Sequence, residues 1–527
     1  MAWTVTLLCV LAFQAHLSYQ ISKPEDKEYV AAVVEFSPSI HRGNWSLTVN
    51  ENTLRYQQYI VKASKANADI IVFPECGLTS ISFPEASKID QWTTFIPSPL
   101  NNYTPCTENS VPVSSALKTL SCAAKENQIY VVINIAEKVK RCTDEKCSEH
   151  ETIYHNTNVV FDRTGKVIAR YRKVNLFDED SFNVTAVPEI VTFETDFGVK
   201  FGTFICFDIL FHVPALNLTR QHGVTDFVYS TAWFSEIPFL TADQTQFGWA
   251  YSENVNLLAA GYNRPKTSTT GSGIYLGRKG IARTVFSREE GDQLLIERVP
   301  KIGLHPVVDD GKTTTISDID STKESGKEEN NVSWEEVHFQ LQDNISRFNT
   351  DIVDQLTDKK ICHGSFCCSF KVNISTIDRN IKYRIAVFNG RRFYGRNTEV
   401  AVQVCGLVQC ANDSLESCPS TKRSETTFNE IEITSTFHEY QTNLVMPSTL
   451  NSSILPFTSF SYDEHTHDDH VHIAMILSKP TKNIVTFGLY GRIISQDAQA
   501  NAGMITPSFP LILSLVLGII LALRSYN

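Results

Sequence analysis

The sequence has no surplus of basic residues. It holds 47 lysines and arginines against 58 aspartates and glutamates, which gives a net charge of −11. A general nucleic-acid binder presents a basic face, so this balance argues against nucleic acid as a partner. The apolar runs at the two ends are too short to cross a bilayer, which takes about 20 apolar residues. With 527 residues the chain is nevertheless long enough for two domains, and we expect two.

Both ends have features of export and anchoring signals. Val5 to Phe13 form a short uncharged apolar run, which predicts a secretory signal peptide over residues 1–20. Phe509 to Leu523 form a second run near the C-terminus, preceded by small residues. This pattern predicts a removed signal for a glycosylphosphatidylinositol (GPI) anchor over residues 501–527, attached at Asn501, with a short tail-anchored helix as the alternative. We therefore expect the mature protein on the outer face of the cell membrane, or secreted.

The sequon Asn-x-Ser/Thr, which directs N-glycosylation of exported proteins, recurs along the chain. A single sequon arises easily by chance, but this many in one chain are typical of a glycoprotein. The predicted acceptors are Asn44, Asn102, Asn183, Asn217, Asn331, Asn344, Asn373, Asn412 and Asn451.

Cysteine usage agrees with an oxidising compartment. Cys9 leaves with the signal peptide, and most of the remaining cysteines fall into two even sets, so disulfides can close within each domain. Pairing cannot be deduced from the sequence, and Cys76 and Cys206 are left over. The two sets are Cys106, Cys122, Cys142 and Cys147, and Cys362, Cys367, Cys368, Cys405, Cys410 and Cys418.

Strand-like and helix-like segments alternate through the first part of the chain, which predicts an α/β layered fold over residues 29–305. Residues 306–331 are polar and have no apolar period, so they predict a linker. Short β-like runs follow, and residues 332–494 are predicted to form a smaller, β-rich domain. The expected segments include strands at 29–36, 69–73, 129–135, 156–161, 199–207, 226–230 and 257–261 and helices at 51–66 and 241–254, with a further helix ending at 222.

Three residues in or beside predicted strands can take part in chemistry. Cys206 lies where a strand runs into a probable helix, and helix-start N–H groups there favour a thiolate and can hold an oxyanion. A buried core thiol is the commoner alternative for an arbitrary strand cysteine. Glu75 directly follows a strand and Pro74, and Lys173 lies in a basic stretch. Taken singly, each is equally compatible with an ordinary loop acid or a solvated strand face.

The order of these residues resembles the signature of the nitrilase superfamily. Phe73-Pro74-Glu75, then Arg172-Lys173, then Gly202-x-x-x-Cys206-x-Asp208 match its successive Glu, Lys and Cys motifs. Within it, the match is to the vanin and biotinidase group, through Thr231-Ala-Trp233 and through the Cys-His-x-x-x-Cys-Cys run within 361–368. The resemblance implies an αββα sandwich with a smaller β-rich C-terminal domain.

The resemblance also implies a reaction, the hydrolysis of small linear amides outside the cell without a cofactor or a catalytic metal. Glu75 is then the general base, Lys173 stabilises the oxyanion and assists proton transfer, and Cys206 attacks the carbonyl to give a thioester. The backbone N–H of Phe207 completes the oxyanion site. Pantetheine is the first candidate substrate and biotinyl-lysine the second. A non-enzymatic surface ectodomain on the same scaffold is the alternative from another class.

Four further residues are less specific. Glu179 fits a second, auxiliary glutamate that many nitrilase-type enzymes have after the lysine, although a solvated loop acid explains it equally well. Thr231 and Trp233 are predicted to line the pocket, with Trp233 as a core residue the alternative. Cys76 stands beside Glu75 where vanins commonly have Asp, and it is either buried and inert or part of a disulfide.

A histidine tract in the second domain is a candidate metal site. His-rich tracts can bind zinc or copper, but the spacing here matches no closed site. We therefore interpret it as an acidic, polar surface loop, and the sequence predicts no metal site. The tract comprises His465, His467, His470 and His472, interleaved with Asp463, Glu464, Asp468 and Asp469.

Overall fold

The computed structural model describes residues 21–84, 88–142, 150–185, 187–302, 339, 341–438 and 440–497. The predicted signal peptide, the polar linker, the anchor signal with Asn501, and the sequon at Asn331 lie outside this part of the chain. Among the described residues, no helix combines the length and the apolar character needed to cross a membrane. The other sequon asparagines are exposed or half-buried, and their glycosylation stays a prediction.

Two six-stranded sheets form the first domain. The first has the order β13-β1-β2-β3-β4-β5, and the second β12-β11-β10-β8-β7-β6. The first comprises β1 (Glu28–Glu35), β2 (Ile70–Val72), β3 (Tyr130–Cys142), β4 (His150–Phe161), β5 (Val167–Arg172) and β13 (Gln293–Pro300). The second comprises β6 (Thr192–Glu194), β7 (Lys200–Ile205), β8 (Asp226–Thr231), β10 (Asn256–Gly261), β11 (Ser272–Leu276) and β12 (Ile281–Val285).

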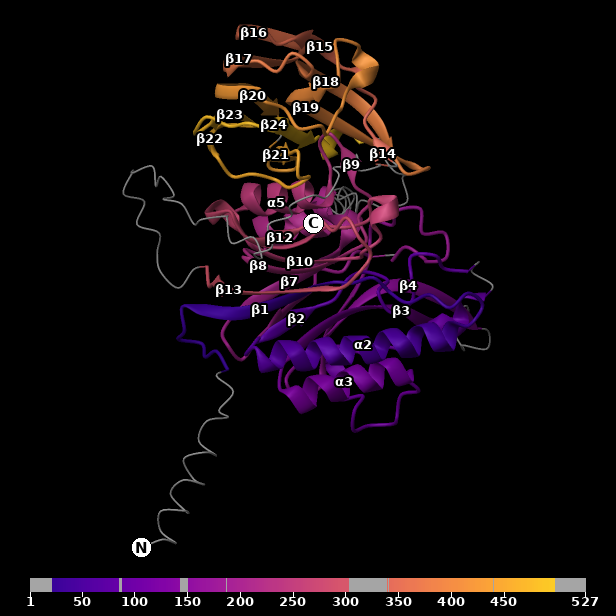
Figure 1. The fold of residues 1–527 in the computed structure, drawn as a ribbon. Coiled ribbons are helices and arrows are strands. Elements are labelled where there is room, and N and C mark those ends of the chain that lie inside the picture. Colours follow the sequence, from indigo (N-terminus) through magenta and orange to yellow (C-terminus); the bar gives the residue numbers. More distant parts are fainter. Residues whose placement is uncertain are drawn as a thin grey trace, which may run out of the picture.

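The sheets face each other and helices cover their outer faces. Val33 and Val72 of the first sheet pack with Val228 and Leu258 of the second, and all four are fully buried. Helices α2 (Trp45–Lys65) and α3 (Ser115–Asn127) cover the first sheet, and α5 (Ala242–Glu253) covers the second (Figure 1). The predicted αββα sandwich is confirmed.

Several of the predicted element boundaries were wrong. The helix expected at 51–66 begins at Trp45, because the Asn44 side chain accepts a hydrogen bond from Leu47 N and caps it. The strand expected at 199–207 ends at Ile205, and the helix expected to follow it is broken into short turns. Val213 is extended there because it precedes Pro214, and a residue before proline avoids the helical region. Those turns are a 3-10 helix η4 (Cys206–Leu210), a π-helical turn η5 (His212–Leu216) and α4 (Asn217–Arg220).

The second domain is β-rich, as predicted, and consists of two packed five-stranded sheets, β15-β18-β19-β24-β21 and β16-β17-β20-β23-β22. The histidine tract was predicted to be a loop, but most of it lies in two paired strands, because alternate residues such as Val471 and Ile473 are buried in the core. The strands are β15 (Asn349–Ile352), β16 (Leu356–His363), β17 (Phe366–Thr376), β18 (Lys382–Tyr394), β19 (Thr398–Cys410), β20 (Thr427–His438), β21 (Leu444–Asn451), β22 (Phe460–His467), β23 (His470–Leu477) and β24 (Ile484–Arg492).

Disulfides close within each domain, as the even cysteine sets predicted. Cys76 and Cys206 are free and buried. The pair Cys368–Cys405 joins β17 to β19 and so links the two sheets of the second domain. The side chains of Cys142 and Cys147 lie outside the described residues. The described pairs are Cys106–Cys122, Cys362–Cys367, Cys368–Cys405 and Cys410–Cys418.

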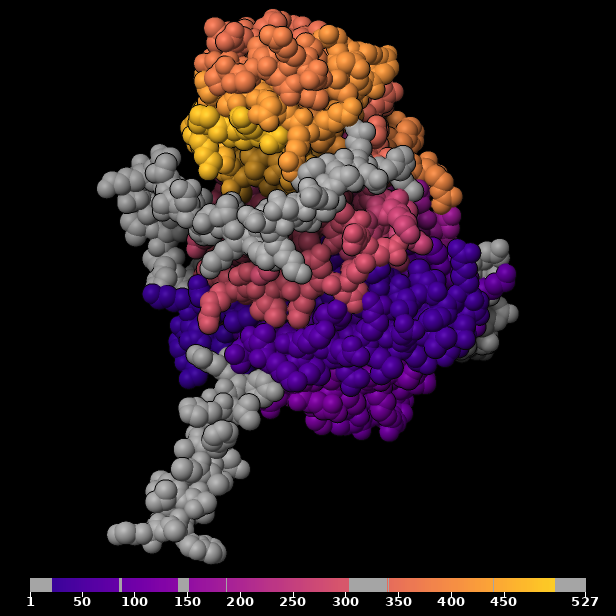
Figure 2. Space-filling model, in the orientation of Figure 1, coloured from indigo at the N-terminus to yellow at the C-terminus, as the bar shows by residue number. Residues whose placement is uncertain are grey.

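The second domain packs against α5 through β21 (Figure 1). In Figure 2 its orange and yellow residues lie next to the pink residues of the first domain. At Gly248 of α5 an added Cβ would lie 2.4 Å from the Pro447 carbonyl oxygen on β21, so only glycine allows this approach. A short parallel pair, β9 (Glu236–Ile237) with β14 (Leu341–Gln342), adds a backbone connection. Beside it, buried Arg392 pairs with Glu236 and Asp343. The two domains therefore share a continuous, well-packed boundary.

Candidate active site

The predicted catalytic residues meet at one edge of the sandwich. Glu75 follows β2, Lys173 directly follows β5, and Cys206 directly follows β7. Thr231 ends β8, which runs parallel to β7. These side chains come from carboxyl ends of strands in both sheets, and Glu75, Lys173 and Cys206 are only 3%, 2% and 6% exposed. Sequence motifs 98 and 33 residues apart are thus brought together in one buried site.

Glu75 is held by three donors. The Lys173 Nζ lies 2.8 Å from Glu75 Oε1, and the Asn156 Nδ2 donates to the same oxygen at 2.8 Å. The other oxygen, Oε2, accepts from the Ala232 backbone N–H at 3.0 Å. Two of these contacts hold one carboxylate oxygen and the third holds the other, so the carboxylate has a defined orientation between the two sheets.

Glu179 also belongs to this site. It forms an ion pair with Lys173, and its Oε2 accepts from the Asn156 Nδ2 at 2.7 Å. Burial raises the pKa of Glu179 from its usual value, and Lys173 opposes that shift. Burial by itself lowers the pKa of Lys173, but the charges of Glu179 and Glu75 offset it and hold that pKa well above its usual value. Lys173 is therefore a permanent cation between two carboxylates.

The Cys206 backbone is strained and firmly anchored. Its φ of +46° lies in the left-handed region, which costs a non-glycine residue about 1–2 kcal/mol. The Tyr229 hydroxyl donates to the Cys206 carbonyl at 2.9 Å. Asp208 accepts from Ile205 N at 3.0 Å and from the Tyr171 hydroxyl at 2.7 Å, which fixes the turn on its other side. The turn places the buried thiol near the charges of Glu75 and Lys173.

The Cys206 thiol is set up to keep its proton until a base removes it. Burial, followed by the negative charge of Glu75, raises the pKa of the thiol well above its usual value. The positive charge of Lys173 lowers that pKa, but not enough to reverse the shift. A buried thiol with a carboxylate and an ammonium beside it is suited to nucleophilic attack on a carbonyl.

Two asparagines support the site and were not predicted from the sequence. Asn156 on β4 bridges Glu75 and Glu179, as above. Asn134 on β3 donates to the Asn156 Oδ1 at 2.7 Å and accepts from the Cys76 backbone N–H at 2.9 Å. The available signal was the presence of asparagine in otherwise apolar strands, since a buried amide needs partners. Cys76 is buried and free, so it does not form a disulfide.

The remaining predicted residues, Phe207, Thr231 and Trp233, lie close to this centre but have different neighbours. Phe207 packs edge-on against Phe177 and against Tyr394 of the second domain, with ring centroids 5.2 and 5.5 Å apart. Thr231 is fully buried at the end of β8, and its hydroxyl has no hydrogen-bond partner among the described residues. Trp233 is largely buried in the core, and its Nε1 donates to the Leu240 carbonyl at 2.9 Å, which agrees with the core reading.

The second domain holds the segment that carries Glu179. The turn between β18 and β19 contacts Asp178: the Arg396 backbone N–H donates to both of its carboxylate oxygens at 3.0 Å. The Arg396 guanidinium also reaches Asp180 at 2.7 Å. Gly395 has a φ of +58°, and a Cβ there would lie 2.4 Å from the Asp178 carboxylate. The position of Glu179 therefore depends on a hairpin turn more than 200 residues away in the sequence.

We expect Gly395→Ala to lower kcat/KM for amide hydrolysis by roughly tenfold, because a displacement of this size near reacting groups is costly. The added methyl displaces Asp178 and with it Glu179. Gly364→Ala is a matched control: its φ of +63° is in another hairpin turn, and its nearest neighbour is 3.9 Å away. Initial rates of both variants and the parent check this. Equal rates for Gly395→Ala and Gly364→Ala would show that the turn does not position Glu179.

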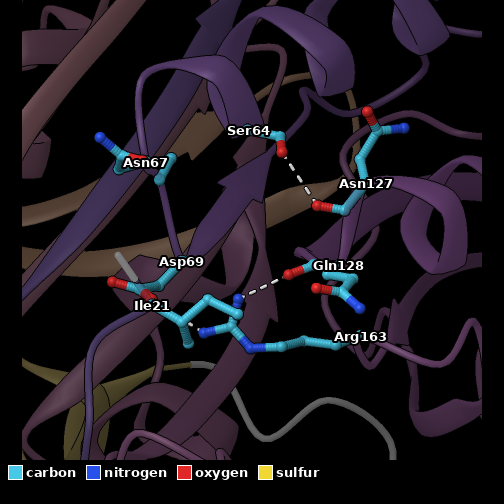
Figure 3. A pocket seen from close by; sticks show the side chains of 8 residues that line it. Ile21, Ser64, Asn67, Asp69, Asn127, Gln128 and Arg163 are labelled. Carbon is cyan, nitrogen blue, oxygen red and sulfur yellow. Dashed lines mark hydrogen bonds and ion pairs between the residues drawn. The ribbon is translucent and has the colours of Figure 1, made fainter. Parts of the chain in front are cut away.

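A small depression far from this centre has no reactive group free to act. It is lined by Asp69, Gln128 and Arg163, among others (Figure 3). The Arg163 guanidinium lies 2.8 Å from the Asp69 carboxylate and donates to the Gln128 carbonyl at 2.7 Å. Its charged groups are engaged with each other, so the candidate active site is the cluster around Cys206.

Comparison with known proteins agrees with this geometry. Residues 30–242 match the family model of the carbon-nitrogen hydrolases, and residues 337–497 match that of the vanin C-terminal domain. The Vanin-like protein 1 of Drosophila melanogaster is 35% identical over 95% of this chain and 92% of its own length. The chain belongs to the vanin family. This vanin-family chain is an amide hydrolase, and the alternative of a non-enzymatic ectodomain is not supported.

A second relative and a solved structure are also similar to this chain. The protein of Mus musculus named pantetheinase is 32% identical over 98% of this vanin-family chain and 98% of its own length. A solved structure from Saccharomyces cerevisiae, described as a member of the nitrilase superfamily, covers 53% of the chain and 93% of its own, with 21% identity and a TM-score of 0.40.

Proposed function

We propose that this chain hydrolyses the amide bond of pantetheine outside the cell and releases pantothenate and cysteamine. The observation that carries the proposal is the buried contact of Lys173 with Glu75 and Glu179 beside the Cys206 thiol. Full-length similarity to proteins named pantetheinase supports this substrate.

In the first half-reaction, Glu75 takes the Cys206 proton as the sulfur attacks the amide carbonyl. The carbonyl oxygen becomes an oxyanion, which the Lys173 ammonium and the Phe207 backbone N–H stabilise. Glu75 then returns the proton to the amine nitrogen as the carbon–nitrogen bond breaks. Cysteamine leaves and the pantothenoyl group remains on Cys206 as a thioester.

In the second half-reaction, Glu75 removes a proton from a water molecule that adds to the thioester carbonyl. The carbon–sulfur bond breaks, the thiolate regains the proton, and pantothenate leaves. Glu179 keeps Lys173 charged throughout, since its carboxylate stays paired with the ammonium while Glu75 gains and loses a proton.

The test is product release from purified mature chain, measured by mass spectrometry of pantothenate, because the thiol count does not change in this reaction. We expect pantothenate from pantetheine at a rate well above that with biotinyl-lysine. Release of biotin from biotinyl-lysine without turnover of pantetheine would replace the substrate but keep the amide hydrolase. No turnover of either compound by folded protein would refute the proposed substrate class.

We also propose that a lipid anchor at the C-terminal tail holds the mature glycoprotein at the outer face of the cell membrane. Treatment of intact expressing cells with phosphatidylinositol-specific phospholipase C is expected to release the activity into the medium. Activity that stays with the cells after treatment would indicate the short tail-anchored helix instead, and activity found in untreated medium a secreted protein.

A further inference from the structure

Five histidines share one face of the second domain. On the three adjacent strands β20, β23 and β22, His438 lies directly opposite His470, and His470 lies directly opposite His467. Residues directly opposite each other in an antiparallel pair point to the same face of a sheet. His472 is two residues beyond His470 and lies opposite His465, so both join the same face.

This face is open to solvent while its frame is packed. His438 and His467 are exposed and His470 is half-buried. The residues that alternate with them, Phe437 and Val471, are fully buried in the domain core. The positions of the imidazoles are therefore set by a rigid sheet and not by a loop.

The distances suit a shared metal ion. The His438 and His470 rings are 5.7 Å apart between centroids, and the His467 and His470 rings 6.0 Å. The His470 Nδ1 lies 3.2 Å from the Asp469 carboxylate. One ligand atom from each of His438, Asp469 and His470 falls within 4.8 Å of the others, and in the described part of the chain this is the one such group. Small side-chain rotations bring such atoms within the roughly 2.0–2.2 Å of one centre that zinc sites need.

The chemistry of these donors selects the class of ion. Imidazole nitrogens favour borderline divalent metals such as Zn²⁺ and Cu²⁺, whereas Ca²⁺ needs six or more oxygens. One nearby carboxylate, Glu464, is already engaged by Arg278 at 2.8 Å and by the Tyr440 hydroxyl at 3.0 Å. Among the acids of the tract, Asp469 is the one whose carboxylate lies within reach of both His438 and His470.

We propose that His438, His470 and Asp469, with His467 as the fourth ligand, bind a divalent transition-metal ion of the Zn²⁺ or Cu²⁺ class. The site lies on β20, β23 and β22 of the second domain, and these strands are well separated from β2 and β7, which precede Glu75 and Cys206 (Figure 1). β22 is the edge strand of its sheet, so the ion ties this edge to β23 and β20. Its role is in structure or metal capture and not in amide hydrolysis.

Isothermal titration of the mature chain, purified without a polyhistidine tag, tests this with separate Zn²⁺, Cu²⁺ and Ca²⁺ titrations at pH 7.5. We expect one saturable site for Zn²⁺ and Cu²⁺ and none for Ca²⁺. His470→Ala, at the centre of the row, is expected to weaken binding by at least about tenfold, as loss of even a supporting partner does in metal sites. His222→Ala is the matched control, since His222 is an exposed histidine of the first domain.

Two outcomes would overturn the site: the same affinity in His470→Ala as in the parent, or Ca²⁺ binding as tight as that of Zn²⁺, which would indicate a diffuse acidic surface. Folding of the variants is checked by amide hydrolysis, which no histidine of this row contacts. Electron paramagnetic resonance of the Cu²⁺-loaded protein gives a second readout. Nitrogen couplings are expected in the parent and reduced in both His470→Ala and His438→Ala, whereas spectra without nitrogen couplings would contradict the assigned ligands.

Discussion

Replacing Cys206 with alanine is expected to lower kcat for amide hydrolysis by at least about 10³-fold, because the sulfur forms the bond to the substrate carbonyl. The substitution removes one buried sulfur atom at a strained turn and leaves Glu75, Lys173 and Glu179 paired. Single-turnover and steady-state rates of pantothenate release measure the effect. Incubation with iodoacetamide followed by peptide mass spectrometry is expected to place the adduct at Cys206.

Cys76→Ala is the matched control for that substitution. Both thiols are free and buried, both have positive φ, and they flank the same carboxylate, Glu75. The pKa of Cys76 is also raised well above its usual value, by burial and then by Glu75 and Glu179. The Cys76→Ala variant is expected to keep its turnover rate within a few-fold of the parent, because the backbone N–H of Cys76, and not its sulfur, contacts Asn134. If Cys76→Ala loses as much activity as Cys206→Ala, the loss in Cys206→Ala does not identify Cys206 as the nucleophile.

Replacing Lys173 with methionine is expected to reduce both activity and stability. Methionine fills nearly the same buried volume but leaves the Glu75 and Glu179 carboxylates facing each other without a cation. Removing one partner of a buried ion pair costs about 3–5 kcal/mol, and losing the oxyanion donor lowers kcat by about 10²–10³-fold. Thermal unfolding and initial rates measure the two effects separately.

A second substitution separates the two roles of Lys173. In Lys173→Met/Glu179→Gln the excess negative charge is removed, so stability is expected to recover while turnover does not. The single variant also has a characteristic pH dependence. Glu179, whose pKa is already raised by burial, binds a proton more tightly in the folded than in the unfolded chain. Stability of Lys173→Met therefore rises as the pH is lowered from 7.5 toward 5.5. A stability of the single variant equal to the parent at pH 7.5 would contradict the ion-pair geometry.

The alternation of apolar segments was enough to predict the layers of the first domain, because each strand and helix carries its own period. Glu75 and Cys206 stand at the ends of such strands, and all three of Glu75, Lys173 and Cys206 were predicted because they occur in a known order. Their roles as base, oxyanion donor and nucleophile are still proposals, but their meeting at one sheet edge is a feature of the structure.

What the sequence did not predict depends on contacts between distant segments. Asn156 reaches both glutamates only because β4 lies beside β3 in a particular register. The contact of Arg396 with Asp178 joins two domains, and no local pattern encodes it. The many charges of the histidine tract predict a loop and hide the alternation of buried and exposed residues that marks a strand. This alternation becomes visible only when the burial of Val471 and Ile473 is known.

Helix α5 has a consequence for how this protein can be divided and assembled. Ten of its 12 residues are buried, since one side faces the second sheet and the other faces β21. A helix buried on all sides has no face left for another molecule. Self-association must therefore use a different surface, and a fragment ending after the first domain would expose Phe247 and the helix side at Gly248 to water. Such a fragment is expected to aggregate rather than to act as a minimal enzyme, so the two domains have to be expressed together.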